Sequence, residues 1–374
     1  MYHHDGRDYQ IAARAAADYG RGKFESMLAE GRARSAAVLQ RVMDEQPADS
    51  LVPASRLTVD LAREEPWVRV GDTDVGRLHP NALQQLATRA GVPLAYVQKL
   101  TGRDEPWARE LAERNFAELL SHQEPSTRYL MRSVAGQVRG VLSDSYKRLD
   151  MSSILESYVG AASALGAVPI DAVGSDLRLA MRFALPTIHE PMPHEVMVYG
   201  VELRSSDYGV GSLGVTFFML RVTCTNLATG SDALRRVHLG ARLTDEAIQY
   251  SARTMELDAA AVCSAMGDTI THLLGDDHIR KVNVGLAAAG SDKLGMGQVQ
   301  GLLKEYLGKK DAEQAAETFQ QDQDIINLPT EPTRWRLSNL LSLMANREPN
   351  AEKKLDLQDA AGKVLGKFMP VAFA

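Results

Sequence analysis

The chain has 374 residues, of which 45% are hydrophobic and 24% are charged, and its formal net charge is −6. These proportions are ordinary for a globular protein that buries one large core or two to three smaller ones. The net acidity excludes a protein that coats nucleic acid by bulk charge, but not one with a local cationic groove, because affinity for phosphates depends on the charges that touch them.

No membrane segment and no secretory signal are expected. No apolar run approaches the roughly 18–20 residues that a membrane span needs, and the start MYHHDGRDYQ lacks a cationic end followed by an apolar stretch. The two cysteines, Cys224 and Cys263, lie in apolar patterns typical of small core residues. We therefore expect no disulfide framework and a cytoplasmic location in a host cell.

The expected elements divide the chain into four regions. In chain order they are an Ala- and Arg-rich helical arm at 1–50, a helical subdomain at 51–124, a β-rich core at 125–243 and a C-terminal helical region at 244–374. Strands and helices segregated in this way favour an α+β fold, since a parallel α/β fold needs regular alternation of the two. We expect a central antiparallel β-sheet with a hairpin–helix core, flanked by helical regions at both ends of the chain.

Helical periodicity and helix breakers define the outer regions. The arm has apolar residues at helical spacing from Phe24 to Val42, and the segment 46–53, which contains Pro47 and Pro53, is expected to be a linker. Expected helices of the second region lie at 80–90, 94–100 and 106–120. Beyond the core, a long helix capped by Thr244 or Asp245 precedes helices at 297–307, 312–321, 333–346 and 351–368.

Alternation of apolar and polar residues predicts the strands of the core. A hairpin is expected over 129–134 and 137–142 with Ala135-Gly136 as its turn, and further strands at 176–185, 195–204 and 213–225. Asp144 would then begin a helix or tight turn, because its carboxylate can accept unpaired backbone N–H groups. The segment 209–214 matches G-x-G-x-x-G, but it lies between strands, so a hairpin loop is the better interpretation.

The segment 80–100 resembles a helix-turn-helix, since two short helices are joined by a turn that contains Gly91. The polar residues expected on its surface are Gln84, Arg89, Gln98 and Lys99. The second helix opens with the apolar Leu94, where a DNA-reading helix would present polar side chains. This favours packing of the two helices over DNA recognition.

Catalytic and metal chemistry has little support in the sequence. One cluster near a helix end could hold a divalent ion: His272, Asp276, Asp277 and His278. Such residues more often form a solvated turn, because a metal site also needs a closed geometry. No P-loop pattern is present, and neither Ser143 nor Cys224 has a histidine near it in the sequence. We therefore assign no catalytic residue, no metal ligand and no cofactor.

A cationic surface is the remaining candidate for a binding site. Guanidinium groups contact phosphates bidentately, and tyrosine rings stack on bases. The residues that could converge on one groove are Arg132, Arg139, Lys147, Arg148, Arg221, Arg235, Arg236 and Arg242, with Tyr146 or Tyr208 as a stacking face. The alternative is a set of solvated charges paired with Asp144, Asp150 and Asp207.

Three segments together resemble a family of phage- and plasmid-borne proteins that is defined only as a domain of unknown function. They are VRGVLSDSYKRLD (138–150), DYGVGSLGVTFFMLRVTCTNLATG (207–230) and PTRWRLSNLLSLMAN (332–346), and ALQQLATRAGVPLAYVQKL (82–100) is similar to the family's N-terminal helical pair. The chain departs from the family at Leu227, where glycine is usual, and in the Arg-rich first helix. The phage and plasmid setting implies a role in replication, recombination or host takeover.

The order of hairpin and helix at 129–165 is also similar in outline to phage single-strand annealing proteins of the RecT, Red-beta and Erf kind. That resemblance implies ATP-independent binding of single strands and assembly into homo-oligomeric rings or filaments. It is a likeness of fold, and fold alone does not determine function.

The leading hypothesis is a phage-type protein that binds and anneals single-stranded DNA during recombination or replication. Arg132, Arg139, Lys147, Arg148 and Arg221 would hold phosphates, and Tyr146 would stack on a base or brace the turn. Two alternatives stay open: an interaction protein that modulates a host or phage complex through its first helix or its helical pair, and a metal-dependent enzyme acting on nucleotides through 272–278.

Overall fold

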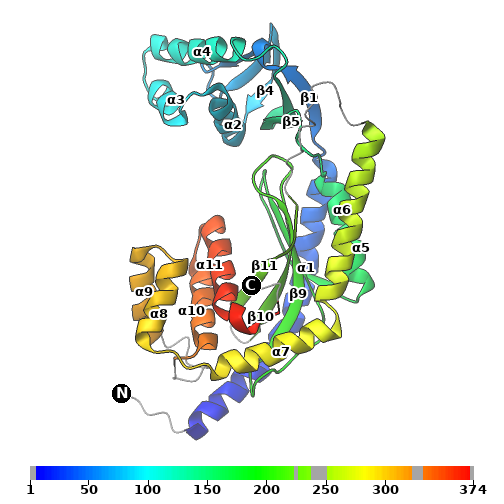
Figure 1. Ribbon diagram of the computed structural model, residues 1–374, viewed down its shortest axis with the longest axis vertical. Coiled ribbons are helices and arrows are strands. Elements are labelled where there is room, and N and C mark those ends of the chain that lie inside the picture. The colour runs from blue at the N-terminus through cyan, green and yellow to red at the C-terminus, as the bar shows by residue number, and fades with distance from the viewer. Residues whose placement is uncertain (1–5, 223–225, 237–250, 322–331, 371–374) are drawn as a thin grey trace.

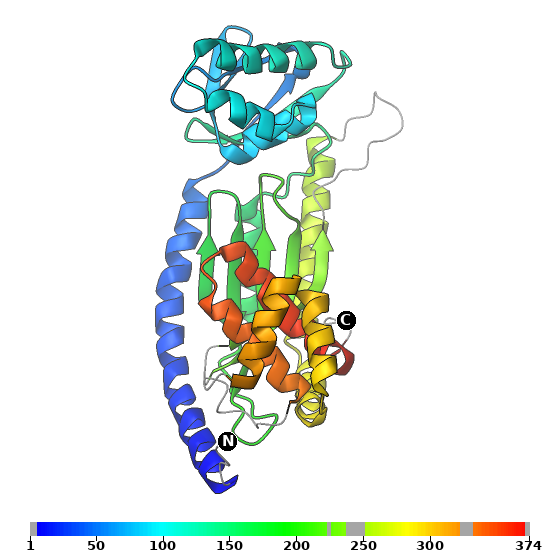
Figure 2. The ribbon, with the colours of Figure 1, turned by 90° about the vertical axis from the view of Figure 1, so that its left-hand side faces the viewer.

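The computed structural model describes residues 6–222, 226–236, 251–321 and 332–370. It has two parts (Figures 1 and 2). The small part, residues 48–143, is called the head; the large part, called the body, comprises the described residues from 151 to 370 and the long helix α1 (Gly6–Asp44). The expected α+β class is confirmed, with helical regions at both ends of the chain, but the strands form two sheets instead of one central sheet.

The head is built on a six-stranded sheet with the order β1-β5-β6-β4-β3-β2. The strands are β1 (Ala48–Pro53), β2 (Leu57–Asp60), β3 (Trp67–Val70), β4 (Thr73–Leu78), β5 (Arg128–Val134) and β6 (Gln137–Ser143), and the 3-10 helix η1 (Ala54–Arg56) joins β1 to β2. Three helices pack against it: α2 (Pro80–Ala90), α3 (Leu94–Thr101) and α4 (Pro106–Ser121). Their side chains Leu86, Phe116 and Leu120 are fully buried.

The hairpin of β5 and β6 is confirmed, including its turn. Ala135 has φ 48° and Gly136 has φ 77°, the left-handed pair that a two-residue type I′ turn requires. This hairpin belongs to the head, however, because β5 pairs with β1 and β6 pairs with β4. The expected boundary between 124 and 125 is therefore wrong. The expected linker at 46–53 is also wrong, since it contains β1, and the expected helical subdomain contains β2, β3 and β4.

The body is built on a five-stranded antiparallel sheet with the order β11-β10-β9-β8-β7. The strands are β7 (Val168–Gly174), β8 (Leu179–Ala184), β9 (Met197–Ser205), β10 (Leu213–Arg221) and β11 (Asn226–Arg236). Helices α5 (Met151–Ala164) and α6 (Ala252–Leu273) lie on one side of the sheet, and α10 (Arg334–Arg347) and α11 (Ala351–Leu365) on the other (Figure 1). The remaining helices are α7 (Asp276–Ser291), α8 (Met296–Tyr306), α9 (Lys309–Gln321) and the 3-10 helix η3 (Gly366–Phe368).

Both faces of this sheet are covered, and each is fixed by a polar contact from a helix. On the α5 side, the hydroxyl of Tyr158 donates to the carbonyl of Val201 at 2.6 Å. On the other side, the fully buried Glu202 pairs with Arg182 and Arg204, and Arg204 reaches Asp359 of α11 at 3.2 Å. A buried carboxylate between two guanidinium groups keeps its charge, and the pKa of Glu202 is lowered because these cations outweigh its burial, which alone would raise the pKa.

Helix α1 runs along the edge strand β7 (Figure 2). Gly31 allows the closest approach, because a Cβ at this position would lie 2.3 Å from the carbonyl oxygen of Ile170. Phe24 is buried against the body, and Arg34 lies 3.6 Å from Asp171 of β7. The arm predicted from the sequence is therefore a packed part of the body that covers a sheet edge.

Helices α8 to α11 follow the predictions closely, whereas α7 was not expected and the long helix α6 begins later than predicted. Its N-cap is Ser251, whose hydroxyl accepts the backbone N–H of Thr254 at 3.2 Å. The expected caps Thr244 and Asp245 lie outside the described residues, as does Cys224, while Cys263 is a free, half-buried thiol in α6. Among the helices that the structure describes, none has the length and apolar character to cross a membrane.

Candidate functional site

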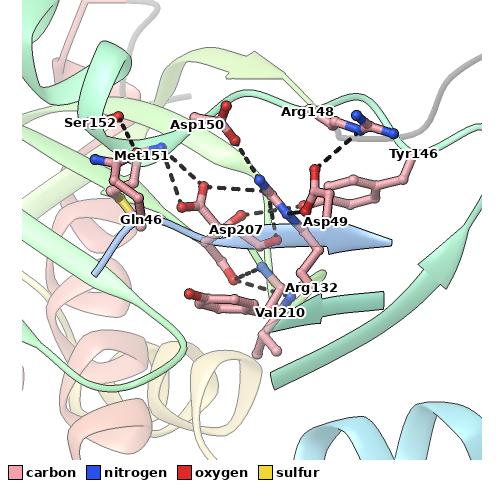
Figure 3. A network of polar contacts seen from close by, with 12 residues as sticks. Gln46, Asp49, Arg132, Tyr146, Arg148, Asp150, Met151, Ser152, Asp207 and Val210 are labelled. Carbon is pink, nitrogen blue, oxygen red and sulfur yellow. Dashed lines mark hydrogen bonds and ion pairs between the residues drawn. The ribbon is translucent and has the colours of Figure 1, made fainter. Parts of the chain in front are cut away.

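Arg132 lies at the centre of a buried polar network between head and body (Figure 3). Its side chain is 1% exposed. Nε donates to Asp49 at 2.8 Å, Nη2 to Asp150 at 2.5 Å, and Nη1 to the backbone carbonyl of Asp207 at 3.1 Å. The network, here called the junction, thereby connects strands β1 and β5 of the head to the start of α5 and the β9–β10 loop of the body.

Asp207 gives the junction its unusual charge balance. Its carboxylate accepts the N–H of Met151 at 3.1 and 3.3 Å, at the first residue of α5, and lies 4.0 Å from Nη1 of Arg132. Burial raises the pKa of Asp207 to about 7; Asp150 and Asp49 act in the same direction, and Arg132 opposes them. One guanidinium is thus surrounded by three carboxyl groups, and one of these holds a proton near neutral pH.

Arg139 lies beside the junction, in a shallow hollow between α1, the head and the body. Its Nη1 donates to Glu45 at 2.7 Å and to the carbonyl of Asp176 at 3.3 Å, and its guanidinium lies 5.8 Å from the ring centre of Tyr208. Arg41 reaches the same hollow from α1 and donates to the carbonyl of Ser175. The cations that line this hollow are therefore bound to groups of the chain itself.

The other predicted phosphate ligands also have carboxylate partners. Lys147 contacts Asp258 at 2.8 Å, and Arg148 contacts Asp49 at 3.4 Å. Arg221 is buried and holds Glu195 at 2.5 and 3.0 Å. It pairs with Met197 at the beginning of β9, at the opposite end of the sheet from the β9–β10 loop of the junction.

The expectation of an open cationic groove is therefore wrong for the cations that the structure describes. Arg132, Arg139, Lys147 and Arg148 do gather near the junction, but each is neutralised, and Arg221 lies apart. Tyr146 is 9% exposed and its hydroxyl donates to the carbonyl of Ser206 at 3.4 Å, so it braces the junction instead of offering a stacking face. Arg235 and Arg236 belong to β11, but their side chains lie outside the described residues, as does Arg242. The alternative of paired charges holds in part. Arg132 contacts Asp150 and Asp207 as expected, but it is buried instead of solvated, and the other partners are Asp49, Glu45, Asp258 and Glu195.

Of two local expectations next to the junction, one is confirmed and one is wrong. Asp144 begins a turn, as one of its two alternatives predicted, but α5 begins only at Met151, so Lys147 and Arg148 precede the helix instead of entering it. The sequence segment 138–150 thus connects the head to the body. Its charged residues form ion pairs that stabilise this connection.

The histidine cluster at 272–278 does not gather as metal ligands. His278 is buried, with its ring centre 4.9 Å from Phe217 and 5.5 Å from His272. Burial, helped by His272, lowers the pKa of His278 to about 4. Asp277 pairs with Arg280 and Lys281 on the surface. In the described part of the chain, no three His, Cys, Asp or Glu side chains group as metal ligands would.

A different surface of the head has exposed apolar side chains. On α4, Trp107, Leu111 and Leu119 are 51%, 37% and 46% exposed. With Asn115 they follow one another at four-residue spacing, so they form a continuous ridge along the helix. Tyr96 of α3 is 37% exposed and its hydroxyl accepts from Asn115 at 3.2 Å, which places it beside this ridge.

Charged side chains of both signs stand on the same two helices and on the loop between them. Lys99, Arg103, Arg114 and Glu110 are exposed, and among the described residues none of the four has an oppositely charged partner within 4.0 Å. Arg103 instead covers the ring of Trp107, 5.6 Å from its centre. We call this surface the α3–α4 face; its residues are Tyr96, Lys99, Arg103, Trp107, Glu110, Leu111, Arg114, Asn115 and Leu119.

The spacing of apolar residues in α4 indicates this face in the sequence itself. Helix α4 has two neighbouring apolar rows at four-residue spacing. The row of Ala108, Ala112, Phe116 and Leu120 is buried, and the row one residue earlier is the exposed ridge. The helical pair at 80–100 exists as predicted, with Gly91 at φ 72° in its turn, but Arg89 donates to the carbonyl of Val141 and packs on Tyr129.

A scan against protein-family models, a search of curated proteins and a search of solved structures each found no match to this chain. The resemblance to phage- and plasmid-borne proteins therefore stays a prediction from the sequence.

Proposed function

We propose that this chain is an interaction protein whose head binds a protein surface through the α3–α4 face. The observation that carries the proposal is the exposed ridge of Trp107, Leu111 and Leu119 beside charges that have no oppositely charged partner among the residues that the structure describes. Four of the twelve large apolar residues that are exposed in the described chain lie on α3 and α4. A concentration of this kind is typical of binding surfaces.

The composition of the face supports a protein partner. Tryptophan, tyrosine and arginine are the residues that most often dominate the binding energy of protein interfaces. Their aliphatic stems and aromatic rings bury a large contact area, and the hydrogen bonds of their polar groups make binding specific for one partner. Tyr96, Trp107 and Arg114 provide these side chains on two adjacent helices, and Arg103 adds one from the loop between them.

Charge balance favours protein over nucleic acid as the ligand of the head. The segment 48–143 holds equal numbers of cationic and anionic side chains, so it has no net charge that would attract a polyanion. Of the cations predicted to hold phosphates, the five whose side chains the structure describes are engaged by carboxylates at the junction and at Glu195. Single-strand annealing stays a prediction from the sequence, and the experiment below tests both functions.

The test is site-specific photo-crosslinking of the full chain in cells that encode it. A photoreactive amino acid in place of Trp107 is expected to give covalent adducts with protein. The matched control places it at Tyr19, which is exposed on α1 far from the head, and should give none. Absence of adducts at position 107 would overturn the proposal.

A titration of labelled single-stranded oligonucleotide tests the other ligand class. The proposal expects no change in fluorescence anisotropy at low salt. Annealing would instead require binding that weakens steeply as the salt concentration rises. Strong, salt-dependent binding that Trp107→Ala weakens would assign the face to nucleic acid and contradict the proposal.

A further inference from the structure

We infer that the partner of the α3–α4 face is the same face of a second copy, with the two α4 helices packed antiparallel about a two-fold axis. The inference rests on the proposed function and names the partner of that same surface. An interface of this kind is isologous, which means that each residue must meet its complement on an identical surface. The face must therefore be complementary to itself in shape and in charge.

The shape of α4 suits a second helix. The ridge of Trp107, Leu111, Asn115 and Leu119 follows the four-residue row that forms ridges and grooves in the commonest class of helix packing. Two such ridges interdigitate when two helices cross. With 16 residues, α4 is about 24 Å long, which is enough for the whole ridge to engage its copy.

The charges beside the ridge are self-complementary. Glu110, Arg114 and Glu118 follow one another at four-residue spacing, so their signs alternate along one flank of the ridge. Antiparallel pairing brings the same flank of both helices together. If the two-fold axis passes near Ala112, Arg114 faces Glu110 of the partner subunit, and the symmetric contact forms as well. A parallel arrangement would instead set this charged flank against the other side of the partner's ridge, where the buried row of Ala108 and Ala112 lies.

The place of α4 in the molecule leaves room for a second copy. The helix lies on the side of the head that faces away from the body (Figures 1 and 2). Neither the long α1 nor the body helices cover it. Two heads can therefore meet while the two bodies point away from each other.

The experiment measures the mass of the full chain by sedimentation equilibrium over a range of concentrations. The expected result is a reversible dimer. Trp107→Ala should raise the dissociation constant by about thirtyfold, the scale of a truncated hot-spot residue. Circular dichroism checks that each variant is folded. A wild-type chain that is monomeric at every concentration overturns the inference, as does a dimer that Trp107→Ala leaves unchanged.

A pair of charge variants tests the antiparallel register. Glu110→Arg makes the flank cationic at positions 110 and 114, and Arg114→Glu makes it anionic at both. Each variant alone should be monomeric, because like charges would meet. An equimolar mixture should recover the dimer, because the cationic flank then faces the anionic one. A mixture that stays monomeric beside a wild-type dimer overturns the register.

The two proposals fail differently. If the crosslinked adduct at position 107 has twice the mass of the chain, both hold. If it contains another protein and the wild type is monomeric, the inference fails while the proposed function stands. If position 107 gives no adduct of either kind, the proposed function fails with it.

Discussion

The junction and the α3–α4 face show two opposite uses of arginine in one small domain. At the junction, Arg132 is 1% exposed and every polar end of its side chain meets an acceptor of the chain. On the α3–α4 face, Arg103 and Arg114 are exposed and have no carboxylate partner among the described residues. A guanidinium that is already paired and buried connects parts of the fold, whereas an unpaired one beside apolar side chains is available to a partner.

This difference teaches that a count of cations along a segment does not identify a binding surface. The junction segment 128–150 holds the densest set of predicted ligands, yet their carboxylate partners come from α1, β1, the start of α5 and α6. Substitutions at the junction should therefore change the stability of the fold. Substitutions on the face should change association and leave stability nearly as it is.

The largest expected effect is that of Arg132→Gln. The substitution leaves the carboxyl groups of Asp49, Asp150 and Asp207 together without their cation, and removing one partner of a buried ion network costs about 3–5 kcal/mol. The free energy of unfolding from urea denaturation measures it. The matched control is Arg253→Gln, whose side chain is 73% exposed in α6 and should change stability by under about 0.5 kcal/mol. A loss below about 1 kcal/mol at Arg132 would mean that the junction does not hold head and body together.

The next largest effect is a dependence of the free energy of unfolding on pH, which the titration of the Asp207 carboxyl group causes. Its pKa is raised to about 7, mainly by burial, whereas an unfolded aspartate titrates near about 3.9. The folded chain therefore binds more protons than the unfolded chain between these values. The contribution of Asp207 to stability is full below about pH 4 and is lost as the pH rises to about 7, by an amount on the order of 2–4 kcal/mol.

Asp207→Asn isolates this contribution. Asparagine cannot release a proton, and its carbonyl can still accept the N–H of Met151. The variant should therefore lack the wild-type decline of unfolding free energy between about pH 4 and pH 7. Asp277→Asn, an exposed position on α7, serves as the control and should retain that decline. Parallel pH profiles for the wild type and Asp207→Asn would show that the carboxyl group is ionised throughout.

The elements that the sequence predicted correctly are those whose determinants are local. The hairpin turn follows from Ala135-Gly136, and the helices at α2, α3, α4 and α8 to α11 follow from periodicity, Gly and Pro. The assignment of the hairpin to the head could not be predicted in this way, because its pairing with β1 and β4 joins segments that are far apart in the sequence. The prediction of the binding site was wrong for the same reason. Asp49 and Asp207 lie 83 and 75 residues from Arg132 in the chain, and no spacing rule links them.

The smallest expected effect is that of Trp107→Ala on stability, and its comparison with a substitution in the buried row of α4 tests the contrast most directly. Phe116 is fully buried, so Phe116→Ala should cost about 3–5 kcal/mol of unfolding free energy. Trp107 is 51% exposed, so Trp107→Ala, although it removes the larger side chain, should cost under about 1 kcal/mol when the protein is dilute enough to be monomeric. Far-ultraviolet circular dichroism during urea denaturation measures both without using tryptophan fluorescence. Since the two residues share one helix, differences in helix propensity or in distance from the body cannot explain the gap. If Trp107→Ala were as costly as Phe116→Ala, the ridge would be part of the head's core, and neither a partner nor a second copy would be needed to account for it.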